Sequence, residues 1–301
     1  MSGTPYQRLL KNDVTPRAYV VLGTLTILVG WMLGSVVLIG IQGGIRKDPP
    51  GTLSWFGLLM TNLTLIILIP LSMLVAKLLN RQTPGLLSSV VGKLRWRPLA
   101  WFSLAAIVLE LVAFAVVQFG NVPLATGERH GGPAAPDVVA VIVITLLTSP
   151  IQAAGEEYYF RGYLLQAVGT YLRGAIVAVV VTAVLFTLAH GILPWQSPAL
   201  FVDRLAFGLV AGFLAIRTGG LESGIASHAA NNVVTFVFAG LTNSLGASLQ
   251  VHDAPWALVV VDVLKFAAFG AVAVWMAGRM NLRTESELPL ATLPAGAPGR
   301  V

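Results

Sequence analysis

The chain alternates long apolar runs with short polar segments. Eight apolar runs are each long enough to cross, or nearly cross, a bilayer as a helix: residues 18–42, 55–76, 99–118, 138–154, 175–189, 199–216, 224–241 and 257–276. The first run has 25 residues, against roughly 7–15 in a signal-peptide core, so we expect a retained span. The pattern predicts an all-α polytopic integral membrane bundle of about eight transmembrane helices.

The composition agrees with this pattern. Of the 301 residues, 56% are hydrophobic and 11% are charged, whereas soluble domains have roughly 45–50% apolar residues. The apolar runs divide the chain into a polar N-terminal segment at 1–17, an integral membrane domain at 18–283 and a C-terminal tail at 284–301. The tail is rich in Pro, Ala and Gly, so we expect it to be disordered.

The lysine and arginine residues predict an orientation. Basic side chains in short loops favour the cytoplasmic side, and here they gather at both ends of the chain and in every second loop. We therefore predict a multi-pass protein of the cell membrane with both termini, including segment 1–17, in the cytoplasm. The net charge of +6 follows from this topology, so no nucleic acid partner is expected.

Ionisable groups are concentrated in the second half of the chain. Apart from Glu110, the first three apolar runs hold almost none, and the second half contains Glu156, Glu157, Arg161, His190, Asp203, Arg204, His228, Asp262 and Lys265. Such groups are costly at membrane depth unless they are paired or hydrated, so the cluster predicts a functional site. The chain has no cysteine, which excludes disulfides, thiolate metal sites and a cysteine nucleophile.

Two adjacent glutamates begin the motif EEYYFR within the stretch GEEYYFRGYLL at residues 155–165. Glu157 and Arg161 are four residues apart and are expected to form an ion pair on one helical face. Glu156 lies about 100° further round the helix, so Arg161 can pair with only one of the two glutamates. The midpoint between residues 156 and 190 is residue 173, inside a polar turn, which predicts that Glu156 and His190 lie at the same height in a helical hairpin.

Two more four-residue steps lie on later apolar runs: Phe186 with His190, and His228 with Asn232. Phe186 is expected to pack rather than react. A carboxylate, two imidazoles and an amide at one buried place would supply a general base, a group that orients water, and donors for an oxyanion. The same groups could instead bind a divalent metal such as zinc. Both alternatives stay open, although Gly191 stands where a HExxH motif needs glutamate.

The remaining ionisable groups have simpler interpretations. Asp262 and Lys265, three residues apart, are expected to form a structural ion pair. Asp203 and Arg204 are adjacent and are expected to pair with groups on other helices. Alternatively, Asp203 could hold His190 in place.

Three motifs follow one another on successive apolar runs, and their order is specific. EExxxR, FxxxH and HxxxN occur at residues 156–161, 186–190 and 228–232. In this arrangement the chain resembles the CPBP family of CAAX prenyl proteases and bacteriocin-processing enzymes, also called the Abi family. The resemblance covers roughly residues 138–241, about a third of the chain, and this segment would be the motif core of a protease domain at 18–283.

The resemblance implies an intramembrane glutamate endopeptidase acting on membrane-associated peptides or proteins. Glu156 with His190 would activate water, and His228 with Asn232 would support the oxyanion. The supporting residues implied are Glu157 and Arg161. No cofactor or metal is assigned, and dependence on a divalent metal such as zinc is left open.

Other classes of function also fit parts of the sequence. A non-catalytic membrane scaffold or regulator of a partner membrane protein would use the motif residues only for structure. A transporter with Glu156 as a proton relay is less favoured, because His228 and Asn232 would then need no particular spacing. The expected partners are the lipid bilayer and a membrane-associated substrate; the motifs define neither the oligomeric state nor the cleavage site.

Overall fold

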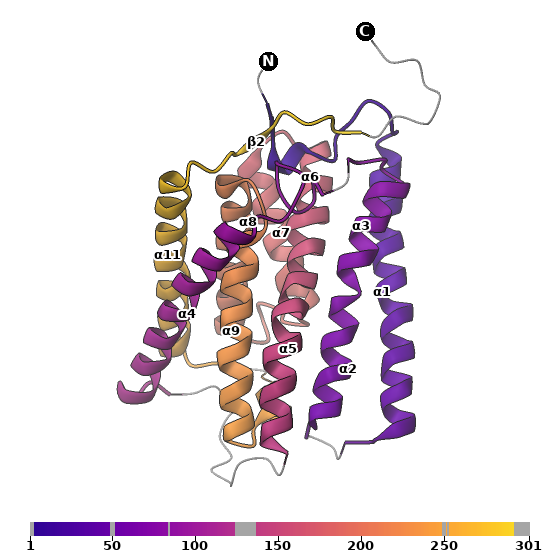
Figure 1. Ribbon diagram of the computed structural model, residues 1–301. Coiled ribbons are helices and arrows are strands. Elements are labelled where there is room, and N and C mark those ends of the chain that lie inside the picture. The colour runs from indigo at the N-terminus through magenta and orange to yellow at the C-terminus, as the bar shows by residue number, and fades with distance from the viewer. Residues whose placement is uncertain are drawn as a thin grey trace.

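The computed structural model describes residues 3–48, 52–83, 85–123, 137–248, 251 and 253–291. Within these residues the chain forms eight long helical stretches (Figure 1). They are α1 (Ala18–Ile45), α2 with α3 (Trp55–Ile66 and Leu68–Leu78), α4 (Trp96–Phe119), α5 continuing through η2 and α6 (Val138–Glu157, Tyr158–Leu164 and Leu165–Tyr171), α7 (Ala175–Ala189), α8 (Pro198–Thr218), α9 (Glu222–Leu241) and α11 (Trp256–Arg279). The predicted all-α membrane bundle is confirmed.

Six of these stretches are long and apolar enough to span a membrane, and α7 is a shorter apolar helix. Helix α9 has 20 residues but is less apolar, since His228 and two asparagines lie within it. It packs between α5 and α4, while α5 also packs against α2 (Figure 1). The polar residues of α9 therefore lie inside the bundle, where they can meet those of α5.

The helix that carries the two glutamates does not end after them. Val138 to Tyr171 is one continuous helical stretch of 34 residues, and its middle part, η2, is a π-helix in which the Leu165 N–H donates to the Phe160 carbonyl five residues earlier. π-helical turns are frequent at functional sites. The stretch ends at Tyr171 and α7 begins at Ala175, so the predicted polar turn is confirmed.

The two ends of the described chain meet at one end of the bundle. Strand β1 (Thr4–Pro5) pairs antiparallel with β2 (Glu285–Ser286), and Figure 1 shows β2 at the same end of the bundle as the N-terminus. The tail at 284–301 was expected to be disordered, but its residues 284–291 are ordered because they pair with other backbone segments. Residues 292–301 of that tail lie outside the described part.

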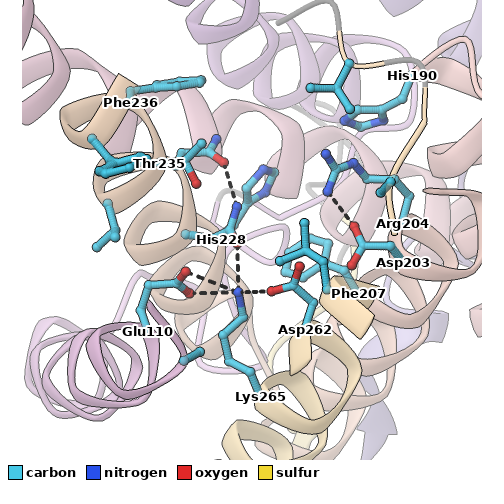
Figure 2. Close-up of a pocket in the computed structure, with 18 of the residues that line it drawn as sticks. Glu110, His190, Asp203, Arg204, Phe207, His228, Thr235, Phe236, Asp262 and Lys265 are labelled. Atoms are coloured by element: carbon cyan, nitrogen blue, oxygen red, sulfur yellow. Dashed lines mark hydrogen bonds and ion pairs between the residues drawn. The ribbon is translucent and has the colours of Figure 1, made fainter. Parts of the chain in front are cut away.

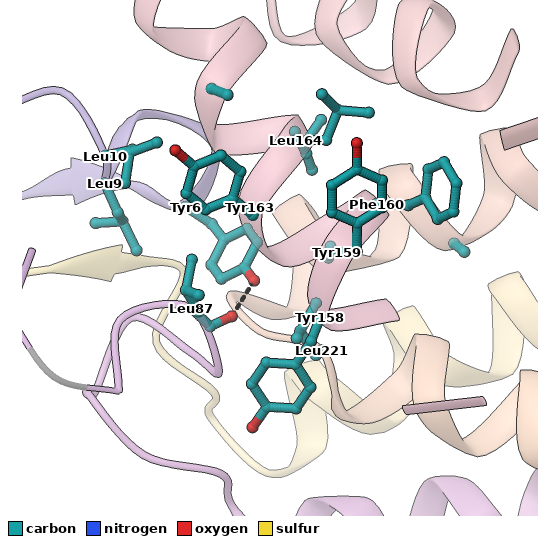
Figure 3. Close-up of a cluster of buried hydrophobic side chains, with 14 of the residues drawn as sticks. Tyr6, Leu9, Leu10, Leu87, Tyr158, Tyr159, Phe160, Tyr163, Leu164 and Leu221 are labelled. Carbon is teal, nitrogen blue, oxygen red and sulfur yellow. Dashed lines mark hydrogen bonds between the residues drawn. The ribbon is translucent and has the colours of Figure 1, made fainter. Parts of the chain in front are cut away.

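The N-terminal segment packs into the bundle rather than lying free. Its short helix η1 (Tyr6–Arg8) places Tyr6 in a buried cluster with η2 residues (Figure 3). The Tyr6 hydroxyl donates to the Leu87 carbonyl at 2.5 Å, and burial raises the pKa of Tyr6 well above its usual value. A Cβ at Gly169 would lie 1.8 Å from the Gln7 carbonyl oxygen, so glycine is needed for this close approach.

Candidate active site

Glu156 and His190 meet inside the bundle, as the hairpin argument predicts. Glu156 lies near the end of α5 and His190 directly follows α7. Their closest atoms, Glu156 Oε2 and His190 Nε2, are 3.8 Å apart. The side chain of Glu156 is 9% exposed and that of His190 is 31% exposed. The carboxylate is therefore the buried member of the pair and the imidazole the accessible one.

The hydrogen bond on the far side of His190 fixes its protonation pattern. His190 Nδ1 lies 2.8 Å from the Phe186 carbonyl oxygen. A carbonyl can only accept, so Nδ1 carries the proton, and in the neutral ring Nε2 is a free acceptor. Glu156 and His190 therefore present two acceptors toward the same small space.

Gln152 is a site residue that the sequence analysis missed. It lies one helical turn before Glu156 and donates from Nε2 to Glu156 Oε1 at 2.5 Å. Its Oε1 accepts from Asn232 Nδ2 at 2.9 Å. One glutamine thus joins the carboxylate on α5 to the amide on α9. The four-residue spacing from Glu156 was the available signal.

Glu157 has two partners, not the single one expected. Its Oε1 accepts from Arg161 Nη1 at 2.8 Å, which confirms the predicted pair, and lies 2.9 Å from His228 Nδ1. The side chains of Glu157 and Arg161 are 0% and 1% exposed. Because Glu157 accepts at Nδ1, a neutral His228 ring has no proton on Nε2, and only an imidazolium could donate there.

Phe186 supports both imidazoles and the guanidinium. Its ring lies 4.1 Å from the Arg161 guanidinium carbon, measured to the ring centroid. Its centroid is 4.5 Å from that of His190 and 6.2 Å from that of His228. Desolvated cation–π contacts of this kind are worth about 2 kcal/mol. Phe186 therefore holds the charged groups of the site in place, in agreement with its predicted packing role.

A cavity of about 380 Å³ opens beside these groups. Glu156, His190, His228 and Asn232 all line it, together with apolar side chains of α2, α4 and α11. The structure therefore brings the four predicted catalytic residues to one cavity. Its lining combines these polar groups with apolar side chains.

A second ionic cluster lies along the same cavity (Figure 2). Lys265 Nζ is 2.7 Å from Asp262 Oδ1, which confirms the predicted pair, and 3.1 Å from Glu110 Oε1. Asp203 and Arg204 pair with each other at 2.6 Å, so the prediction that they reach other helices was wrong. Arg204 is the ion-pair partner of the Asp203 carboxylate. Among the described residues, Asp203 makes no hydrogen bond or ion pair with His190.

Some of the possible metal ligands at the site are engaged by other side chains. Among the residues that the structure describes, no three His, Asp or Glu side chains converge on one point as metal ligands would. His228 Nδ1 is engaged by Glu157, and Glu156 Oε1 by Gln152.

The fold and site define a multi-pass membrane protein with a carboxylate–imidazole pair in an internal cavity. A comparison with known protein families gives a more specific class for part of the chain. Residues 136–234 match the family model described as type II CAAX prenyl endopeptidase, Rce1-like. The predicted resemblance to CPBP-family CAAX proteases is thereby confirmed over this segment, which contains every motif residue.

A second comparison finds a relative in Bacillus subtilis (strain 168). The uncharacterized protein YyaK is 28% identical over 157 residues, which is 51% of this chain and 52% of that protein. The chain thus matches about half the length of this curated relative. Of the two matches, the family model is the one that names an activity, that of CAAX prenyl endopeptidases.

Proposed function

We propose that the chain is an intramembrane endopeptidase that hydrolyses membrane-associated peptides or proteins with water activated by Glu156 and His190. The observation that carries this proposal is the acceptor pair 3.8 Å apart at the cavity wall. A water molecule between Glu156 Oε2 and His190 Nε2 would donate one hydrogen to each. Its oxygen lone pairs would then face the cavity, where a scissile carbonyl can approach.

The reaction follows from these positions. Glu156 Oε2 takes one proton of the water while the water oxygen forms a bond to the carbonyl carbon. The proton is then delivered to the leaving nitrogen as the C–N bond breaks, so that water is added across the peptide bond. His190 keeps the water oriented, and because its side chain is 31% exposed, it lies on the cavity side of the pair.

The oxyanion would be held from the opposite side by α9. Asn232 uses one N–H for Gln152, and its second N–H has no partner among the described residues. His228 can donate from Nε2 only as an imidazolium, and the Glu157 carboxylate 2.9 Å from Nδ1 stabilises that charge. Glu157 and Arg161 would thus act through His228 rather than on substrate.

A comparison of protein termini tests the function without knowledge of the substrate. Membrane and secreted peptides would be compared by mass spectrometry in native cells that make either the intact protein or Glu156→Gln at equal levels. We expect a set of termini that disappears in the variant. Unchanged termini in cells where Glu156→Gln still rescues a deletion phenotype would refute proteolysis and favour a scaffold.

A further inference from the structure

We infer that a one-way chain of hydrogen bonds from Lys265 to Glu156 positions the catalytic carboxylate, with Gln152 as the positioning residue. This inference rests on the proposed role of Glu156. It assigns functions to Gln152, Asn231 and Lys265, none of which belongs to the three sequence motifs.

The chain has four links and crosses three helices. Lys265 Nζ on α11 lies 3.1 Å from Asn231 Oδ1 on α9, and Asn231 Nδ2 lies 3.4 Å from Asn232 Oδ1. Asn232 Nδ2 then lies 2.9 Å from Gln152 Oε1 on α5, and Gln152 Nε2 lies 2.5 Å from Glu156 Oε1. Three of the links are 2.5–3.1 Å long, and the Asn231–Asn232 link, at 3.4 Å, is the longest and weakest of the four.

The direction of the chain is fixed by its two ends. An ammonium group can only donate, and a carboxylate can only accept. Lys265 therefore requires the Asn231 oxygen to face it, which turns the Asn231 N–H groups toward Asn232. The same constraint applies to the next two amides, Asn232 and Gln152, because each accepts at its oxygen from the amide before it. All three amides therefore point their N–H groups toward Glu156.

Lys265 is itself held as a cation by two carboxylates. Its Nζ is 3.1 Å from Glu110 and 2.7 Å from Asp262 (Figure 2). Its side chain is 5% exposed, so it has little contact with solvent and stays committed to these partners. The starting point of the chain is therefore anchored to α4 and α11, in the part of the cavity that this ionic cluster lines.

The consequence falls on the two oxygens of Glu156. The chain ends at Oε1, which leaves Oε2 directed at His190 as the free basic atom. Aligned donors strengthen one another in a low-dielectric interior, and donors directed at a carboxylate stabilise its negative charge. It also fixes Asn232, and through it the second N–H that would meet the oxyanion.

Other charged groups near Glu156 act on it independently of this chain. They are His190 at the end of α7, Arg161 and Glu157 on the helix of Glu156 itself, His228 on α9 and Arg204 on α8. All of them stay unchanged in the variants chosen below. A change in Glu156 therefore reports on the amide chain.

The test measures the protonation of Glu156 without any substrate. Carbodiimides react with protonated carboxyl groups, so the full chain in nanodiscs would be treated with diisopropylcarbodiimide at neutral pH and modified Glu156 quantified by mass spectrometry. We expect Gln152→Met to raise the labelling rate about tenfold or more, because one charge-assisted hydrogen bond is lost. Asn231→Ala should raise it by about two- to threefold.

The double variant is the decisive case. Once Gln152 is replaced, Asn231 has no route to Glu156, so Gln152→Met/Asn231→Ala should label at the rate of Gln152→Met alone, within about twofold. A rate equal to the product of the two single effects would overturn the inference. So would a labelling rate that stays at the wild-type level in every variant.

Asn62→Ala is the matched control. Asn62 lines the same cavity and donates to Thr148 and Ser149 on α5 at 2.7 and 3.1 Å, outside the chain. It should leave Glu156 labelling unchanged, and an effect as large as that of Asn231→Ala would refute the inference. The labelling rate does not depend on cleavage. If Glu156→Gln still cleaved substrate, the proposed function would be refuted, and the labelling experiment would still test the hydrogen-bond chain.

Discussion

The two adjacent glutamates should respond in opposite ways to the same conservative substitution. Glu157→Gln keeps the shape of the side chain and one acceptor but removes the charge beside Arg161. The Arg161 side chain is 1% exposed, and Glu157 is the carboxylate that it contacts among the described residues. Removing one partner of a buried ion pair costs about 3–5 kcal/mol because the other charge stays buried.

The expected loss for Glu157→Gln lies at the lower end of that range. The new amide can still accept one hydrogen bond from Arg161, and the Phe186 ring 4.1 Å from the guanidinium carbon stays in place. We therefore expect about 3 kcal/mol of lost unfolding free energy. Glu156→Gln should cost less than about 1 kcal/mol, because its nearest basic group, on His190, is 3.8 Å away.

Reversible unfolding in mixed detergent micelles measures both variants under the same conditions. The wild type, Glu156→Gln and Glu157→Gln would be followed by loss of helical circular dichroism as the fraction of denaturing detergent rises. The reasoning would be refuted if Glu157→Gln were as stable as the wild type. It would be equally refuted if Glu156→Gln were the less stable of the two.

Three further substitutions test neighbouring contacts. A Cβ at Gly224 would lie 2.7 Å from Glu157 Oε2. Gly224→Ala should therefore cost about 1–3 kcal/mol of stability in the same unfolding assay and slow cleavage. Unchanged stability and an unchanged cleavage rate would contradict this contact. Phe186→Leu removes the ring stacked on Arg161 and should cost about 2 kcal/mol, with a cost near zero counting against it. Tyr6→Phe should cost about 1 kcal/mol at pH 8 through its lost hydrogen bond. Because burial raises the pKa of Tyr6, its stabilisation is full below pH of about 10 and falls at higher pH, as the unfolded tyrosine ionises. Unfolding at pH 8 and 11 should therefore show a smaller alkaline loss in Tyr6→Phe than in the wild type.

The parts of the site that follow from helical geometry could be predicted from the sequence. Spacing alone gave the pair of Glu157 with Arg161, and symmetry about a polar turn put Glu156 level with His190. Both relations involve one helix or one hairpin, whose geometry is fixed by the rise per residue. The structure confirms both, at 2.8 and 3.8 Å.

Contacts between helices distant in the sequence could not be predicted in this way. His228 is 71 residues from Glu157, and Lys265 is 155 residues from Glu110. Which faces meet depends on how α9 and α11 pack. The positions of polar residues along one helix do not specify which other helix its polar face will contact. Gln152 was missed for another reason: an uncharged amide does not stand out by charge, although it has the helical spacing that marks a partner of Glu156.

The central claim is that Glu156 is the base that activates water, and cleavage by purified protein tests it most directly. A peptide spanning one of the termini lost in Glu156→Gln cells would be added to liposomes that contain either wild type or Glu156→Gln, each shown to be folded by its unfolding curve. We expect the variant to cleave at least about 100-fold more slowly, the usual contribution of a general base. Cleavage by folded Glu156→Gln at a rate near that of the wild type would contradict the account.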